Sequence, residues 1–385
     1  MPVIELSDGA CTVELFPFGA AVRAIRVPDR AGTLTDICLG YDDVDSYRRL
    51  DACLGGTIGR CANRIGGARF TIGGTEYRVT PNEGSNCLHG GNQGFHKKLW
   101  AYTCGENSVT FTLDSPDGEE SFPGNLHVEV TYTLEDSTLT IDYRAVTDRD
   151  TVVNLTNHTY FNLAGHNGGR VDGHVLTVRA DRYTPAGPGN VPTGELAPVE
   201  GTPLDFRASA ELGARLTDPF LSGSRGYDHN YVLNGGEQAV AELWCPATGI
   251  GLEMTTTLEG TSISIHAPLA GRDGGCPVDI EQAEQFQSTR PLRGATRQQQ
   301  DILAANGISI HAPLAGRDSA TFRISSPSTD FNPRAPCGAR PGCCTCPAPP
   351  RYFNPRAPCG ARRSIQACIP VGQTISIHAP LAGRD

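Results

Sequence analysis

One histidine within a polar run is the residue of this sequence best suited to moving a proton. His158 lies in NLTNHTYFNLAG (residues 154–165), where Asn157, Thr159 and Asn162 alternate with apolar side chains. An imidazole with an ordinary pKa of about 6.5 can give or take a proton at neutral pH, and a strand among polar groups would hold the ring still. His158 is therefore our candidate proton donor. The alternative is a structural histidine whose nitrogens are hydrogen-bonded within the fold.

Three other short segments carry side chains that suit a ligand with neighbouring hydroxyl groups. His89 in NCLHGG precedes two glycines, which allow the backbone to approach a ligand closely. Asn63 and Arg64 in CANRI combine an amide with a forked donor, and Asp228 in GYDHNY is a carboxylate acceptor. His89, Arg64 and Asp228 also have ordinary interpretations, as a turn histidine, a surface arginine and a turn aspartate.

The elements that would position these residues are short strands. Between residues 1 and 260, alternating apolar segments are interrupted by Gly, Pro, Asn and Asp. Residues 68–79 predict a hairpin with its turn at Gly73-Gly74, and residues 127–146 predict two strands around residues 135–137. No window shows a long 3.6-residue apolar period, so any helices should be short. We expect an all-β fold, a large antiparallel β-sandwich.

Composition limits the partners and the compartment. The chain has 385 residues, a net charge of -10 and a pI near 5.5, which argue against a nucleic acid or an anionic membrane as partner. The start lacks a signal-peptide pattern, and no stretch approaches about 18 uninterrupted apolar residues, so we expect a cytoplasmic protein. The seven cysteines before Thr261 are scattered and odd in number, which predicts reduced thiols.

Besides the segment around His158, six motifs follow one another along the chain. They are GRCANRIGGARF (59–70), NEGSNCLHGG (82–91), GFHKKLW (94–100), SPDGEESFPGNL (115–126), VPTGELAPVEGTPLDFR (191–207) and GYDHNYVLNG (226–235). With these motifs the chain resembles the aldose 1-epimerase, or galactose mutarotase, family over about residues 10–260. The resemblance implies the galactose-mutarotase β-sandwich and interconversion of the α and β anomers of aldohexoses such as galactose and glucose. It implies a small-molecule aldohexose as partner, with no metal and no cofactor.

The resemblance also implies a role for each candidate residue. Mutarotation opens the sugar ring and closes it on the other face of C1, which needs an acid at the ring oxygen and a base at the O1 proton. The resemblance makes His158 the acid and places His89 near the ring oxygen. Contacts to sugar hydroxyl groups are implied for Asn63, Arg64 and Asp228.

Two aromatic residues lie beside these motifs. Tyr160 follows His158 by two positions, and Trp100 ends GFHKKLW. Either ring could present its face to the C–H surface of a sugar, and core packing is the alternative for both.

The base of this family is missing from the sequence. In the family it is a glutamate of a late strand, in a run like LETQ, and the preceding strand carries a glutamine contact. This chain has neither, and the segment that resembles the family ends at about Gly260. We therefore expect residues 1–260 to form an incomplete β-sandwich that lacks its final strands and its base.

Residues 261–385 have a different composition, with 13 Arg, no Lys, 8 acidic residues and 15 of the 28 Pro. ISIHAPLAGRD begins at residues 263, 308 and 375, and FQSTRPLRGAT and two copies of FNPRAPCGAR stand between these copies. The peptides correspond to three reading frames of one nucleotide repeat that recurs every 66 to 68 nucleotides, as in a CRISPR array. We interpret residues 261–385 as translated repeat DNA and expect a disordered tail.

Because of this interpretation, two features of residues 261–385 are assigned no function. Glu281 and Glu284 lack the flanking residues of the family's base, so neither is taken as its replacement. The tail also has a group of cysteines that would otherwise suggest a zinc knuckle. These are Cys337, Cys343, Cys344, Cys346 and Cys359.

The expected function is therefore aldohexose mutarotation impaired by loss of the catalytic glutamate. The alternative is a carbohydrate-binding remnant without catalysis, because the sugar-contact residues are present. A hexose-phosphate epimerase would need a basic cluster for the phosphate, and Lys97 and Lys98 are the only nearby candidates. The preferred aldose and the oligomeric state are left open.

Overall fold

The computed structural model describes residues 1–50, 53–224, 226–234 and 239–256, and the backbone of four further strands at 261–265, 308–311, 317–325 and 375–377. Regular structure in these residues is almost entirely β-strand. The α-helix α1 (Val44–Arg49) and six short 3-10 turns are the helical elements of this part of the chain. The all-β class and the shortness of the helices are both confirmed.

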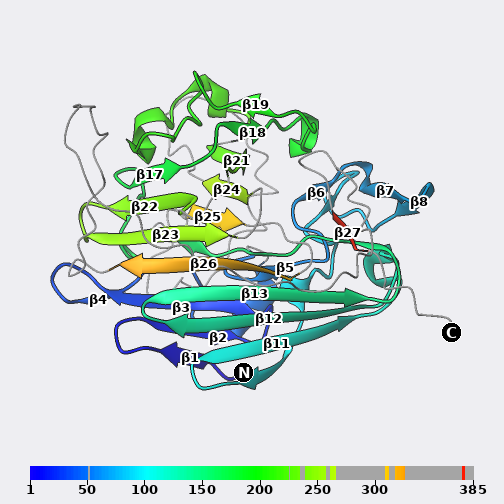
Figure 1. Ribbon diagram of the computed structural model, residues 1–385, viewed down its shortest axis with the longest axis horizontal. Coiled ribbons are helices and arrows are strands. Elements are labelled where there is room, and N and C mark those ends of the chain that lie inside the picture. The colour runs from blue at the N-terminus through cyan, green and yellow to red at the C-terminus, as the bar shows by residue number, and fades with distance from the viewer. Residues whose placement is uncertain are drawn as a thin grey trace, which may run out of the picture.

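The largest sheet has nine strands in the order β10-β11-β12-β13-β26-β23-β22-β17-β20 and crosses the middle of the molecule (Figure 1). Side chains of β12 alternate between buried positions and half-buried or exposed ones. β12 and β13 meet at Asp136-Ser137, where both residues have positive φ, as a two-residue hairpin turn requires. This confirms the predicted hairpin. The strands are β10 (Ala101–Cys104), β11 (Ser108–Ser115), β12 (Leu126–Glu135), β13 (Thr138–Thr147), β17 (Val175–Val178), β20 (Ala210–Glu211), β22 (Ala241–Cys245), β23 (Ile250–Thr256) and β26 (Arg317–Ser325).

Two further sheets have four and six strands. The first has the order β1-β2-β3-β4, with β1 (Ile4–Ser7), β2 (Thr12–Phe16), β3 (Ala21–Pro28) and β4 (Leu34–Asp36). The second has the order β16-β25-β24-β21-β18-β19, with β16 (Tyr160–Phe161), β25 (Ile308–His311), β24 (Thr261–Ile265), β21 (Tyr227–Val232), β18 (Arg182–Thr184) and β19 (Ala197–Pro198).

Four two-stranded pairs complete the described structure, and three of them carry residues of the predicted site or its motifs. The hairpin of β7 and β8 turns at Gly73-Gly74, as predicted. The pairs are β5 (Thr57–Ile58) with β15 (Thr156–Asn157), β6 (Arg64–Ile65) with β9 (Cys87–Leu88), β7 (Arg69–Ile72) with β8 (Thr75–Arg78), and β14 (Thr151–Val153) with β27 (Ile375–Ile377).

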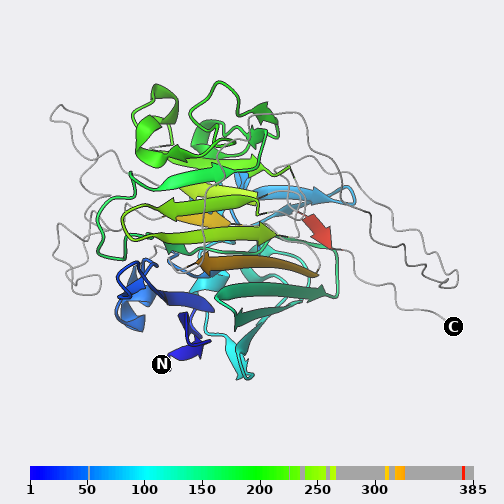
Figure 2. The ribbon, with the colours of Figure 1, turned by 60° about the vertical axis from the view of Figure 1, so that its left-hand side comes forward.

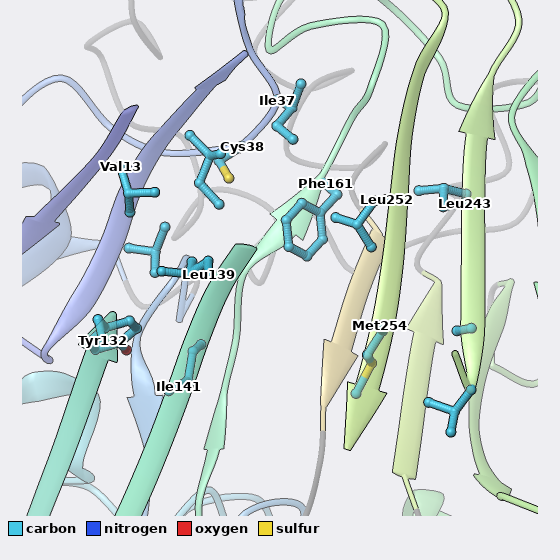
Figure 3. Close-up of a cluster of buried hydrophobic side chains, with 14 of the residues drawn as sticks. Val13, Ile37, Cys38, Tyr132, Leu139, Ile141, Phe161, Leu243, Leu252 and Met254 are labelled. Atoms are coloured by element: carbon cyan, nitrogen blue, oxygen red, sulfur yellow. The ribbon is translucent and has the colours of Figure 1, made fainter. Parts of the chain in front are cut away.

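The three larger sheets share one hydrophobic core. Val13 of β2, Leu139 of β13 and Phe161 of β16 belong to the same buried cluster as Leu252 of β23. In Figure 3 the ring of Phe161 lies beside Leu252, so β16 packs directly on the largest sheet. Burial of each such side chain contributes about 1.5–3 kcal/mol, and this core therefore fixes β16 and the His158 segment that precedes it.

Four segments of the tail form strands, although its composition led us to expect no regular structure there. β26 lies between β13 and β23 and pairs with both (Figures 1 and 2). The ISI tripeptide of each ISIHAPLAGRD copy is also in a strand, at 263–265, 308–310 and 375–377. Alternating isoleucines favour this conformation whatever their origin. The rest of the tail, with Glu281, Glu284 and the tail cysteines, lies outside the described residues.

No disulfide joins the described cysteines. Of the seven before Thr261, five are buried, Cys53 is half-buried and Cys104 is exposed. This agrees with the predicted reduced state. Among the residues that the structure describes, we find no helix with the length and hydropathy of a membrane span.

Candidate active site

His158 lies between two short strands and not within one continuous strand. Its N–H donates to Gly56 O at 2.9 Å, and its own carbonyl accepts from Gly55 N at 2.9 Å. Gly55 has a φ of +64°, and a Cβ there would lie 1.8 Å from Val22 O, so glycine is required at this contact. The His158 segment is thus bound on both sides of its backbone, and the residue is only 6% exposed.

The polar neighbours of His158 form a buried network. Asn157 Nδ2 donates to Gly55 O at 2.8 Å and to Tyr132 Oη at 3.2 Å. Asn157 Oδ1 accepts from Thr159 N at 3.0 Å and from Thr159 Oγ1 at 2.5 Å. The amide therefore holds the residues on both sides of the histidine, as the sequence suggested. Tyr132 was not foreseen, because its place on β12 is an ordinary core position in the sequence.

His89 is held by a reciprocal pair of contacts with Asn63. His89 N donates to Asn63 O at 3.0 Å, and Asn63 N donates to His89 Nδ1 at 3.1 Å. Because Nδ1 accepts a hydrogen bond, the neutral ring carries its proton on Nε2. Both residues have positive φ, 53° for His89 and 59° for Asn63, which is uncommon outside glycine.

The two predicted catalytic histidines meet in the structure. The ring centroids of His89 and His158 are 5.4 Å apart and the rings are nearly perpendicular, at 88°. The ring centroid of Tyr160 is 5.0 Å from that of His158, with the two ring planes tilted by 43°. Burial raises the pKa of Tyr160, and the charges of Cys53 and Asp228 raise it further. His89, His158 and Tyr160 therefore form one connected group of rings, and Asp228 acts on Tyr160 through its charge.

Arg64 forms an ion pair that was not predicted. Its Nε and Nη2 contact the two carboxylate oxygens of Glu83 at 2.6 and 2.7 Å. Arg64 belongs to β6 and pairs in register with Leu88, the residue before His89. The bidentate pair orients the guanidinium and leaves Nη1 outside it. The sequence signal was available, because Glu83 lies in the same motif as His89.

Trp100, the other aromatic candidate, lies in the packed interior. Trp100 is 2% exposed, its Nε1 donates to Phe95 O at 3.1 Å, and its ring packs edge-on against Phe95. Core packing is therefore the role of Trp100. His229 packs against Tyr183 and Phe220, and burial lowers its pKa.

Arg60 is a buried arginine that sequence reasoning missed. It is 2% exposed, and its guanidinium donates to Ser115 Oγ, Ser115 O, Pro116 O and Pro123 O at 2.7 to 3.0 Å. Burial lowers the pKa of Arg60 to about 10, which still leaves it charged at neutral pH. Its own carbonyl accepts from Asn154 N at 2.8 Å, so Arg60 ties residues 115–123 to the start of the His158 segment.

Arg60→Met is expected to lower the free energy of unfolding by about 3 kcal/mol, because several buried oxygens lose their donor together. Urea denaturation of the purified variant measures this loss. Arg144→Met is the matched control, since Arg144 is exposed and pairs with Glu129 on the surface, where the expected loss is below about 1 kcal/mol. Equal small losses in both variants would contradict the structural role of Arg60.

Comparisons with known proteins agree with this fold. The family model described as aldose 1-epimerase matches residues 2–290. A galactose mutarotase from Mus musculus is 41% identical over 276 residues, which cover 70% of this chain and 80% of that protein. An aldose 1-epimerase from Haemophilus influenzae is 37% identical over 269 residues, covering 69% and 78%. The solved structure of an aldose epimerase homologue from C. elegans has a TM-score of 0.71 at 25% identity, covering 84% of this chain and 99% of that one. The chain therefore belongs to the aldose 1-epimerase family of isomerases.

Proposed function

We propose that the pair of His89 and His158 binds the ring oxygen of an aldohexose and that His158 protonates this oxygen as the C1–O5 bond opens. The observation that carries the proposal is the 5.4 Å approach of the two rings at residues matching the family's motifs. His89 would donate from Nε2, since its Nδ1 is occupied by the N–H of Asn63. In the absence of the glutamate, water takes the O1 proton as the ring opens and returns a proton to that oxygen on closure. His158 then takes its proton back from the ring oxygen, so that either anomer can form.

We propose that four residues around this pair contact the hydroxyl groups and the apolar face of the sugar. Asp228 accepts hydrogen bonds from hydroxyls, and Arg64, oriented by Glu83, donates from Nη1. Asn63 lies against His89, and the ring of Tyr160 lies against His158. Tyr160 presents part of its face to the C–H surface of the sugar.

We further propose that the mutarotase part of the chain is residues 1–260 and that residues 261–385 are translated repeat DNA. The family's glutamate would then be absent. Glu281 and Glu284 would be encoded by spacer DNA between two repeats. A positioned general base contributes about 10²- to 10⁴-fold to a rate, so turnover should be weak. The seven cysteines before Thr261, none of them in a disulfide, support a reducing, cytoplasmic location.

A second candidate function is carbohydrate binding without catalysis. It is supported by the presence of all the residues that are proposed to contact the sugar. Binding of the sugar, unlike its mutarotation, needs no general base. A phosphorylated sugar is less well supported. Lys98 forms an ion pair with Glu119, and Lys97 Nζ donates to Asn92 O at 3.1 Å, so both cations have partners within the protein.

Calorimetric titration with D-galactose, together with polarimetry of α-D-galactose, separates these functions. We expect heat of binding, together with a mutarotation rate about 10²-fold or more below that of an intact relative. Asp228→Asn should weaken binding about tenfold, because it removes a charged acceptor. Binding with no turnover at all favours the second function, turnover equal to an intact relative refutes the loss of the base, and the absence of binding refutes both functions.

A further inference from the structure

The motif SPDGEESFPGNL (115–126) has no role in the function proposed above. Its 3-10 turn, Glu119–Ser121, lies against the loop that follows His89. We call residues 88–98 the His89 loop. None of the side chains of residues 115–126 is among the proposed sugar contacts.

Glu120 binds the backbone of the His89 loop directly. Its Oε2 accepts from Asn92 N at 3.2 Å and its Oε1 accepts from Gln93 N at 2.8 Å. Gly91 has a φ of +99°, and a Cβ there would lie 2.4 Å from Glu120 Oε2. The glycine at this position thus allows the carboxylate to come close, and one carboxylate satisfies two consecutive N–H groups.

The backbone of Glu120 is itself held in an uncommon conformation. Glu120 and Ser121 have φ values of 47° and 67°, in the left-handed region that few residues other than glycine adopt. Such conformations persist only where the surroundings determine them strongly. Here Thr80 N donates to Glu120 O at 3.0 Å, and the buried Arg60 binds carbonyls on both sides of the turn.

The other end of the loop is fixed in a similar way. Asn82 Oδ1 accepts from Leu88 N at 2.7 Å, and Asn82 Nδ2 donates to Leu88 O at 3.0 Å. His89 therefore stands between two anchors, Asn82 on the residue before it and Glu120 on the residues shortly after it.

We propose that Glu120 is a positioning residue for His89. By holding the N–H groups of Asn92 and Gln93 it keeps the His89 ring with Nδ1 on the N–H of Asn63 and with the Nε2 proton directed at the ligand. The importance of this position for the sugar rests on the function proposed above for His89. The positioning itself rests on the contacts of Glu120 alone.

Glu120→Gly tests the carboxylate without a backbone penalty, because glycine adopts positive φ freely. Glu120→Gln is the second variant, in which an amide N–H group replaces one of the two acceptors and opposes a backbone donor. Asp136→Gly is the matched control. Asp136 is another acidic residue with positive φ, 48°, in the turn between β12 and β13.

The measurement is the long-range proton–nitrogen NMR spectrum of protein labelled with ¹⁵N-histidine, assigned with His89→Gln. We expect the His89 ring of the unaltered protein to show Nδ1 as an acceptor and Nε2 protonated. In folded Glu120→Gly or Glu120→Gln the His89 signals should shift or show both tautomers, and the Kd for D-galactose should rise about tenfold. Asp136→Gly should leave both unchanged.

Unchanged His89 signals in either folded Glu120 variant would overturn the proposal. If Glu120→Gly does not fold, Glu120→Gln decides, because it keeps the size of the side chain. If the unaltered protein does not bind galactose, the proposed function fails while the NMR comparison still decides the role of Glu120. Shifted signals with an unchanged Kd would confirm the positioning and refute its importance for sugar binding.

Discussion

Replacing residues 261–385 with the C-terminal segment of a complete galactose mutarotase is expected to raise the mutarotation rate about 10²- to 10⁴-fold. Ring opening needs a base that takes the O1 proton and an acid that protonates the ring oxygen, and the proposed site has only the acid. The alignment with the mouse relative leaves part of that protein unmatched, since 80% of it is covered. The measurement is polarimetry of freshly dissolved α-D-galactose with equal concentrations of the natural and the chimeric chain.

The control is the same chimeric chain with the glutamate of its LETQ-like run changed to glutamine. This variant restores the strands of the relative without the base, so its rate should stay near that of the natural chain. A gain in both chimeric chains would mean that the strands and not the carboxylate were limiting. No gain in either, with both folded, would contradict the proposed loss of the base.

The stability of the chimeric chain has to be measured as well, because the tail takes part in the sheets. β26 pairs with seven residues of β13 and with six of β23, so its exchange alters the centre of the nine-stranded sheet. Thermal unfolding of the natural and chimeric chains gives this comparison directly. A rate gain at equal stability is then attributable to the site.

The parts of the fold that were predicted correctly are those encoded by neighbouring residues. The turn at Gly73-Gly74 needs two positive φ values, which glycine supplies, and the turn at Asp136-Ser137 follows from two alternating strands in succession. The network of Asn157 and Thr159 around His158 is also local in sequence. Such features can be recognised without knowing what lies across the fold.

The parts that were missed depend on distant residues. Arg60 looks like any surface arginine until residues 115–123, more than fifty positions later, supply its acceptors. The run around His158 looks like one strand, and it divides because β15 pairs with β5 whereas β16 pairs with β25. The strands of the tail were missed because composition was judged over the whole segment, although each ISI tripeptide has a strong local preference for strand.

His158→Gln in the chimeric chain is expected to lower kcat about 10²- to 10⁴-fold, because glutamine cannot transfer a proton at neutral pH. Sugar binding should change much less, since the amide can still donate a hydrogen bond to the ring oxygen. The ring of His158 is buried against His89 and Tyr160, so a moderate loss of stability accompanies the change. Polarimetry gives kcat and calorimetry gives the Kd.

The stability cost is controlled with His174→Gln, which removes another buried ring, 2% exposed, that accepts from Leu163 N at 3.0 Å. This variant should lose stability but keep its rate.

His89→Gln separates the roles of the two site histidines. If His89 only binds the ring oxygen, its loss raises the Kd more than it lowers kcat. If His158→Gln keeps its rate while His89→Gln abolishes turnover, the acid is His89, and the contact between Asn63 N and Nδ1 then leaves Nε2 as the atom that delivers the proton.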